Sequence, residues 1–220
     1  MLDNLISQLL NGISDLPGWK AQSRLSSSRF KQSNFIPKKN SRQAGVLAII
    51  LNSEPDNPKL LFIKRTTKQN DKHSGQISFP GGQFETEDVT LLNCALRETN
   101  EEVGLQVNDL QVLGPLSQLY VSVSDFIVQP YLAVYDRVPS FILEEEEVAK
   151  VIEYPIKALL KEDAVQYRDL DIRGHKLKDI PYFDLYGETL WGATAMITSC
   201  LLYTSPSPRD QRGFRMPSSA

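Results

Sequence analysis

Three glutamates follow a glycine-rich turn near the middle of the chain. The turn is Phe79-Pro80-Gly81-Gly82, and the glutamates are Glu98, Glu101 and Glu102. Residues three and four apart are neighbours on a helix surface, so the three carboxylates share one side of a helix. At about 100° per residue they lie beside a core face made by the apolar residues of the same segment.

Carboxylates at this spacing repel one another at a cost of a few tenths of a kcal/mol each. They also lie toward the C-terminal half of the helix, where the helix dipole disfavours anions. Mg²⁺ and Mn²⁺ prefer oxygen ligands and would reverse both penalties. The pattern therefore predicts a divalent-metal site on Glu98, Glu101 and Glu102. The alternative is a solvated acidic helix face, because Glu is a good helix former.

Two residues beside the glutamates predict local geometry. Arg97 points to another flank of the helix, where its guanidinium can brace a carboxylate. Gly104 predicts the C-terminal end of the helix in the left-handed conformation.

The segment resembles the Nudix box, whose general pattern is G-x5-E-x7-R-E-U-x-E-E-x-G-U, with U an aliphatic residue. The matching residues are Gly82, Arg97, Glu98, Glu101, Glu102, Gly104 and Leu105. Thr99 occupies the first aliphatic position, and Asp88 lies one residue further from Arg97 than the general pattern has. The resemblance implies a hydrolase of diphosphate bonds that needs Mg²⁺ or Mn²⁺.

The extra residue after Asp88, with a second acid at Glu85, is similar to the coenzyme A pyrophosphatase branch of that family. The branch has an upstream signature of the form L-L-T-x-R-S-x3-R-x3-G-x3-F-P-G-G. Here the matches are Leu61, Arg65, Gly75 and the Phe-Pro-Gly-Gly block. The loop is one residue longer than the signature, and Asp71, Lys72 and His73 stand where its second Arg would be.

The resemblance implies roles for individual residues. Glu98 and Glu102 are the firmest metal ligands, and Glu101 is the third. The general base stays open between a carboxylate of the box, such as Glu101, and Glu147 at the end of a run of four glutamates. A solvated acidic turn is the alternative for that run. Arg97 belongs with the catalytic group as a brace.

The substrate side of the site is predicted from the turn and from nearby cations. Gly81 and Gly82 would allow close approach of a phosphate, although a tight turn alone also explains them. Recognition of coenzyme A would need cations for its 3′-phosphate, and Arg65, Lys72 and His73 are the candidates. Surface solubilisation is the alternative for all three.

Composition limits the class of protein. The 220 residues with a hydrophobic fraction of 41% fit one soluble domain. A net charge of −3 gives no electrostatic footprint for nucleic acid, so the expected partner is a small molecule. No apolar run reaches 18 residues, and no membrane partner is expected. Cys94 and Cys200 are too few for a disulfide framework, which favours a reducing compartment and a cytoplasmic location. The oligomeric state stays open, with a homodimer one option.

The apolar patterns predict how the site is supported. A helix is expected over residues 2–12, followed by a polar extension. Strands are expected over 44–51, 59–65, 112–120, 126–135 and 148–154, with extended segments at 166–170 and 182–185. Helices are expected over 88–103, 155–161 and 191–201. Interleaved strands and helices without a strict βαβ repeat indicate an α/β fold with a mixed sheet. The Nudix resemblance implies an α/β/α sandwich.

The predicted organisation has three parts. Residues 1–41 form an N-terminal helix and polar extension, and residues 42–202 form the Nudix hydrolase domain. Residues 203–220 abandon apolar periodicity for Pro, Ser and Arg. This tail resembles translated cloning sequence more than a domain end, and a native disordered tail is the alternative.

Three functions remain open. The first is a coenzyme A diphosphatase that releases 3′,5′-ADP and 4′-phosphopantetheine from coenzyme A or its thioesters. The second is a Nudix hydrolase for another nucleoside diphosphate, such as ADP-ribose or a dinucleotide. The third is a non-catalytic ligand-binding module on the same fold, which the three intact glutamates argue against.

Overall fold

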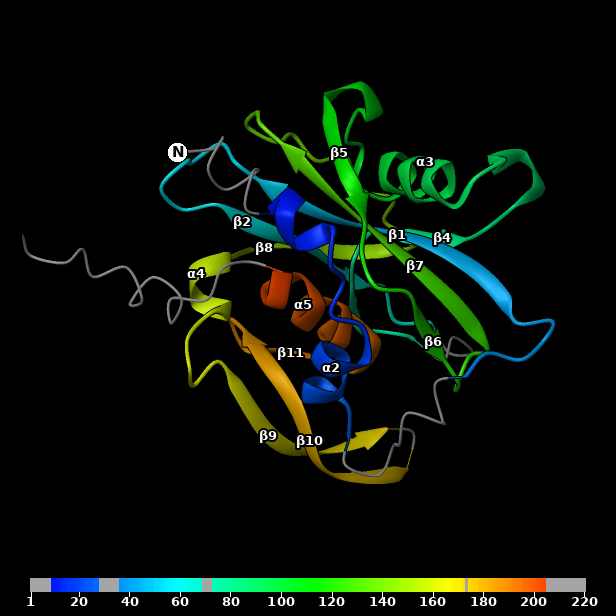
Figure 1. Cartoon of the computed structure of the whole chain (residues 1–220), viewed down its shortest axis with the longest axis vertical. Helices are drawn as coiled ribbons and strands as arrows, with labels where there is room; N and C mark the ends of the chain where they lie inside the picture. Colours follow the sequence, from blue (N-terminus) through cyan, green and yellow to red (C-terminus); the bar gives the residue numbers. More distant parts are fainter. Residues whose placement is uncertain (1–8, 28–35, 69–72, 173, 205–220) are drawn as a thin grey trace, which may run out of the picture.

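The structure is a computed structural model that describes residues 9–27, 36–68, 73–172 and 174–204. A large mixed sheet lies between two helices, with a smaller sheet beside it (Figure 1). The strands of the large sheet are β1 (Arg42–Leu51), β2 (Lys59–Arg65), β3 (Ile77–Ser78), β4 (Gly81–Gln83), β5 (Leu110–Pro115), β6 (Leu119–Val121), β7 (Phe126–Tyr135) and β8 (Val148–Pro155). The helices are α2 (Trp19–Gln22), α3 (Leu91–Val103), α4 (Ile156–Leu159) and α5 (Gly192–Thr204).

The large sheet is built around β1. Its strand order is β3-β2-β1-β7-β5, and β4, β6 and β8 pair with β1, β7 and β2 respectively. β1 and β7 are parallel over their full lengths, whereas β2 and β4 run antiparallel to β1. The predicted mixed sheet is therefore confirmed.

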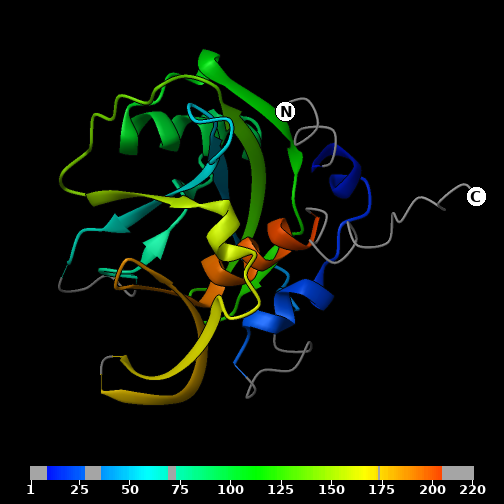
Figure 2. The same cartoon turned by 90° about the vertical axis from the view of Figure 1, so that its left-hand side faces the viewer.

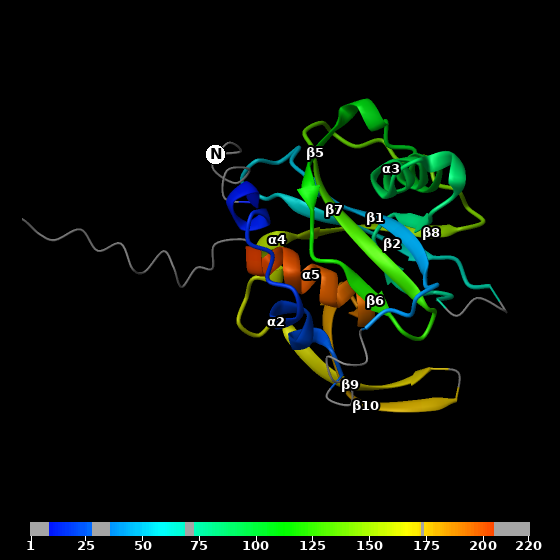
Figure 3. The ribbon, with the colours of Figure 1, turned by 45° about the vertical axis from the view of Figure 1, so that its right-hand side comes forward.

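The two faces of β1 bury two separate cores because successive side chains of a strand point to opposite faces. Leu47 and Ile49 pack on one face with Ala95 of α3. Ala48 and Ile50 pack on the other face in the core that includes Ile197 of α5. Figure 3 shows α3 and α5 on opposite sides of the sheet, which is the predicted α/β/α sandwich.

The smaller sheet was only partly predicted. Its strands are β9 (Val165–Ile172), β10 (His175–Leu185) and β11 (Glu188–Trp191), in the order β11-β10-β9. The β9–β10 hairpin extends from one end of the molecule (Figure 2). Sequence reasoning found short extended segments there and missed β11, because the exposed strands lack a continuous apolar alternation.

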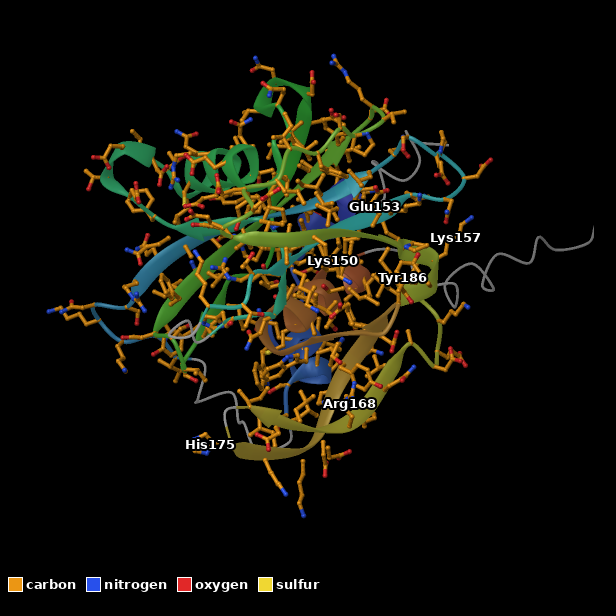
Figure 4. The ribbon with its side chains drawn as sticks, turned by 180° about the vertical axis from the view of Figure 1, so that it is seen from behind. Lys150, Glu153, Lys157, Arg168, His175 and Tyr186 are labelled. Carbon is orange, nitrogen blue, oxygen red and sulfur yellow. The ribbon has the colours of Figure 1, made fainter. Side chains whose placement is uncertain are left out.

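Ion pairs tie the smaller sheet to the large one. The Glu188 carboxylate of β11 lies 2.8 Å from Lys64 Nζ on β2 and 2.7 Å from Lys150 Nζ on β8. The rings of Tyr154 and Tyr186 lie 4.9 Å apart between the same two regions. Figure 4 shows Lys150 and Tyr186 facing this junction and His175 at the far end of the hairpin.

Two predicted boundaries are wrong. The expected strand at 112–120 is two strands, because β5 ends at Pro115 and β6 begins at Leu119. The expected helix at 88–103 begins at Leu91. Residues Thr86–Asp88 form a separate 3₁₀ turn, and the Thr90 side chain caps α3 by accepting from the Asn93 amide.

Residues on the N-terminal side of β1 also contact the core. Residues 9–13 are helical, and residues 2–8 of the expected N-terminal helix lie outside the described residues. Leu9 and Leu25 are buried in the core on the α5 face, and Ser199 donates to the Ala21 carbonyl at 2.8 Å. Helix α5 continues through Thr204, and residues 205–220 of the expected tail lie outside the described residues.

Candidate active site

The glycine turn and the acidic helix meet directly. β4 lies beneath α3, and the Gly81 amide donates to Glu102 Oε2 at 2.9 Å. A Cβ added at Gly82 would overlap the carboxylate of Glu98. Glycine at position 82 therefore lets two carboxylates of α3 lie against the backbone of β4. Helix α3 then ends as predicted at Gly104, whose φ is 73°.

Glu102 is a buried carboxylate, with a side chain 2% exposed. Its Oε2 receives the Gly81 amide, and its Oε1 has no hydrogen-bond partner among the described residues. Arg65 Nη1 lies 3.6 Å from Oε1, a longer ionic contact. Burial raises the pKa of Glu102 to about 8, against the lowering effects of the Gly81 amide and Arg65.

Glu98 lies one turn earlier on the same side of α3. Burial raises its pKa, and the neighbouring Arg97 opposes that shift. The charges of Glu101 and Glu147 raise it further. Two partly desolvated carboxylates of like charge thus lie close together at β4, which is unfavourable unless a cation or a proton is shared between them.

Arg97 is held by three carboxylates. Its Nε lies 2.7 Å from Asp88 Oδ1, its Nη2 lies 3.0 Å from Glu98 Oε1, and its Nη1 lies 2.8 Å from Glu101 Oε2. The Arg97 hydrogen bonds lower the pKa of the buried Asp88 to about 2. Because Arg97 contacts carboxylates and not an open surface, the structure places it as the predicted brace.

Asp88 is the anchor that sequence reasoning left without a role. Its Oδ2 accepts from the Glu85 amide at 2.8 Å, so it closes the turn before α3 as well as orienting Arg97. The available signal was its position: an acid six residues after Gly82, in the first acidic position of the Nudix pattern.

Glu101 lies apart from the other two glutamates. Its side chain is 56% exposed and binds Arg97, whereas the side chain of Glu98 is 16% exposed. Within the described residues, no three acidic, histidine or cysteine side chains converge closely enough to hold a metal ion as they stand. The predicted ligand set is therefore brought to one side of α3, but Glu101 faces Arg97.

Glu147 is positioned by the ends of two elements. The Thr66 amide after β2 donates to the Glu147 carbonyl at 2.8 Å, and the Glu144 amide donates to the Glu102 carbonyl at 3.1 Å. Glu147 is half-buried, whereas the other three glutamates of its run are exposed. The charge of Glu147 contributes to the raised pKa of Glu102, and its backbone joins the segment that is hydrogen-bonded to the Glu102 carbonyl.

The predicted substrate cations have different outcomes. Arg65 and His73 line a cleft together with Gly81 and Gly82. The His73 ring Nδ1 lies 3.1 Å from Gln76 Oε1. Lys72 lies outside the described residues.

The acidic site fits a divalent ion such as Mg²⁺ or Mn²⁺. Its donors are carboxylate oxygens, the ligands these ions prefer. The buried Glu102 Oε1, with no hydrogen bond among the described residues, is a polar atom that an ion would satisfy. Glu98 and Glu102 would hold the ion.

Comparisons with known proteins identify the family. Residues 41–171 match the NUDIX domain family. An uncharacterized Nudix hydrolase of Yersinia pestis, NudL, is 33% identical over 166 residues, which cover 75% of this chain and 80% of that protein. NudL of Yersinia pseudotuberculosis matches equally well.

Solved structures resemble the chain more loosely. A MutT/nudix family protein of Enterococcus faecalis has a TM-score of 0.45 at 15% identity, covering 84% of this chain and 70% of that one. The NUDIX domain of Shewanella oneidensis NrtR, solved with ADP-ribose, has a TM-score of 0.45 at 16% identity, covering 61% and 87%.

The protein is a hydrolase of diphosphate bonds, a class that generally needs a divalent metal ion. The chain belongs to the Nudix family. No helix in the described part of the chain is long and apolar enough to cross a membrane.

Proposed function

We propose that this protein hydrolyses the diphosphate bond of coenzyme A or its thioesters, giving 3′,5′-ADP and 4′-phosphopantetheine or its acyl derivative. The observation that carries the proposal is the position of Arg65 of the upstream signature. It lies 3.6 Å from Glu102 and lines the cleft that begins at Gly81 and Gly82. The signature and the Nudix box thus form one site.

The residues of the site have separate roles in binding the ion and the phosphate. An ion bound there would supply charge neutralisation at the phosphate oxygens and would lower the pKa of a water molecule. Glu98 and Glu102 would hold the ion, and Arg97 orients Glu98. Gly81 and Gly82 carry no side chain of their own, so a phosphate that binds the ion held by Glu98 and Glu102 can lie close to the β4 backbone.

Proton transfer falls to a carboxylate outside the buried pair. Glu147 is half-buried, its charge acts on Glu102 and its segment is hydrogen-bonded to the Glu102 carbonyl, so it is our proposed general base, with the exposed Glu101 as the other candidate. Arg65 lies beside the carboxylates and binds the diphosphate of the substrate. The proposed role of Lys72 in binding phosphate comes from the sequence alone.

A product analysis tests the proposal. Purified protein with Mg²⁺ or Mn²⁺ is incubated separately with coenzyme A, acetyl-coenzyme A, ADP-ribose and a dinucleoside polyphosphate, and products are identified by mass spectrometry. We expect 3′,5′-ADP from the first two substrates. Hydrolysis of ADP-ribose with none of coenzyme A would assign the enzyme to another nucleoside diphosphate, and no hydrolysis of any of them would favour a binding module.

A paired variant test assigns the base. Glu147→Gln and Glu101→Gln are assayed on the same substrate across pH. The variant that lacks the base loses the acidic limb of the pH–rate profile, whereas the other variant retains it.

A further inference from the structure

A cleft of about 270 Å³ opens on the face of the large sheet opposite α3. Its walls come from β1, from the β6–β7 hairpin and from the first half of α5. The apolar side chains among them are Val46, Val121, Phe126, Val128, Ala193 and Ile197. The large sheet therefore separates this apolar wall from α3, which carries the carboxylates. Figure 3 shows α3 and α5 on opposite sides of the sheet.

The cleft begins where the diphosphate is proposed to bind. Gly81 and Gly82, whose other side faces Glu102 and Glu98, are also part of its lining. Arg65 is part of the lining as well. A molecule with its diphosphate at β4 would therefore extend one arm directly into the cleft.

The lining excludes a charged arm. Among the described residues that line the cleft, the charged side chain is Arg65, with His73 the other titratable group. Arg65 lies beside Glu102 at the diphosphate end. A phosphomonoester carried deep into the apolar part would lose its hydration without a counter-charge, which is strongly unfavourable.

The lining also suits a chain better than a purine. The Phe79 ring is 2% exposed and stacks on Phe62 at 5.0 Å, so its faces are covered. The Arg42 guanidinium lies 4.0 Å from the centre of the Phe126 ring and covers one of its faces. A base could not be stacked between two aromatic rings here.

The lining includes one buried hydroxyl group, that of Ser78, which has no hydrogen-bond partner among the described residues. Its Oγ is inaccessible to solvent. A buried hydroxyl without a partner costs about 1–3 kcal/mol, so rotation of the Ser78 side chain toward an amide of a ligand in the cleft would be favoured. An uncharged chain that carries amide groups matches both the apolar walls and this hydroxyl.

We propose that this cleft binds the pantetheine arm of the substrate and leaves the 3′-phosphoadenosine half outside it. This inference rests on the proposed hydrolysis of coenzyme A. It adds that the cleft on the α5 side of β4 contacts the pantetheine half of the substrate. Val121 and Ala193, on facing walls, determine specificity for that arm.

Each of the two products contains one half of the substrate, so each can be used as an inhibitor that reports on the binding of that half. Coenzyme A hydrolysis is measured with 4′-phosphopantetheine or 3′,5′-ADP as inhibitor, using wild type, Val121→Phe and a control. The control is Val123→Phe, which adds the same ring two residues away on the exposed turn of the same hairpin, where Val123 is 67% exposed.

We expect Val121→Phe to raise the KM for coenzyme A and the inhibition constant of 4′-phosphopantetheine by about tenfold or more. Inhibition by 3′,5′-ADP should change less than about twofold, and Val123→Phe should resemble wild type. Ala193→Phe fills the cleft from α5 and should give the same pattern. Ser78→Ala adds no volume, should fold normally, and should weaken 4′-phosphopantetheine a few-fold.

The outcomes distinguish the two proposals. Unchanged 4′-phosphopantetheine inhibition in the folded variants, or weakened 3′,5′-ADP inhibition instead, overturns the assignment of the cleft while coenzyme A hydrolysis stands. A wild-type protein that does not hydrolyse coenzyme A overturns both proposals.

Discussion

The two faces of the large sheet differ sharply in chemistry at β4. On the α3 face, Glu98 and Glu102 lie partly or fully buried against glycine backbone. On the α5 face, the same strand borders an apolar cleft. The α3 face carries clustered carboxylates that need a cation, whereas the α5 face has an apolar cleft with almost no charged side chains.

The comparison shows how one short strand serves both purposes. Gly82 has no side chain to separate the faces, so its backbone is accessible to the carboxylates on one side and to the cleft on the other. The catalytic carboxylates and the cleft that would select the substrate are therefore adjacent, but α3 carries the carboxylates and α5 borders the cleft. Changes on the α3 face should affect turnover, and changes on the α5 face should affect substrate choice.

Glu102→Gln tests the α3 face with the largest expected effect. It removes the charge of the best-buried carboxylate, and we expect kcat to fall by about 10³-fold or more, since metal-derived stabilisation amounts to several kcal/mol. Steady-state kinetics with Mg²⁺, together with calorimetry of Mn²⁺ binding, measures this. A folded variant with unchanged turnover would contradict the metal assignment.

Gly82→Ala tests the contact between β4 and Glu98. The added methyl group would overlap the Glu98 carboxylate, so this side chain must move away from β4. We expect about a 10²-fold loss of kcat, because small displacements of catalytic groups have effects of this size. The control is Gly187→Ala, at a turn where an added Cβ meets nothing within 4 Å but the φ of 89° strains the new residue; this variant should lose some stability while its turnover stays near wild type.

Arg97→Gln tests the brace. The change leaves the buried Asp88 carboxylate without its main partner, and we expect the free energy of unfolding to fall by about 2–3 kcal/mol. Urea denaturation followed by circular dichroism measures it. Arg137→Gln is the matched control, because Arg137 also binds an aspartate, Asp109 at 2.9 Å, but with a side chain 68% exposed. That loss should stay below about 1 kcal/mol.

The pH dependence of stability tests the burial of Glu102. Its pKa is raised in the folded protein from 4.5 to about 8, so the folded state binds the proton more tightly than the unfolded state. The contribution to stability is complete below about pH 4.5 and is lost as the pH rises through about 8.

With metal removed by chelation, wild type should lose about 1–3 kcal/mol relative to Glu102→Gln between pH 5 and pH 8.5. Thermal and urea unfolding at both pH values measures the difference. Parallel pH profiles for the two proteins would show that Glu102 is not buried as described.

Local spacing predicted the acidic helix well. Glu98, Glu101 and Glu102 share one side of α3, and Gly104 ends it, because helix periodicity and a left-handed cap depend on neighbouring residues alone. The divergence of Glu101 toward Arg97 was not predictable, since Arg97 has three carboxylates to choose from and tertiary packing determines the geometry.

Long-range placement was less predictable. Nothing in the local pattern of residues 116–118 or 188–191 showed that β5 and β6 separate or that β11 joins β10, because strand pairing depends on partners distant in the sequence. The apolar cleft was missed for the same reason. Its apolar walls come from β1, the β6–β7 hairpin and α5, which are distant in the sequence, and each apolar residue taken alone indicates only a core position.

The sequence by itself determined the family, the chemistry and the helix that carries the carboxylates. Those properties follow from residue types at fixed short spacings, which helical geometry converts directly into neighbouring side chains. The tertiary structure decided which carboxylates are buried, what Arg97 holds and which apolar residues border the cleft. Burial and desolvation depend on elements that meet only when the chain has folded, so no local pattern contains them.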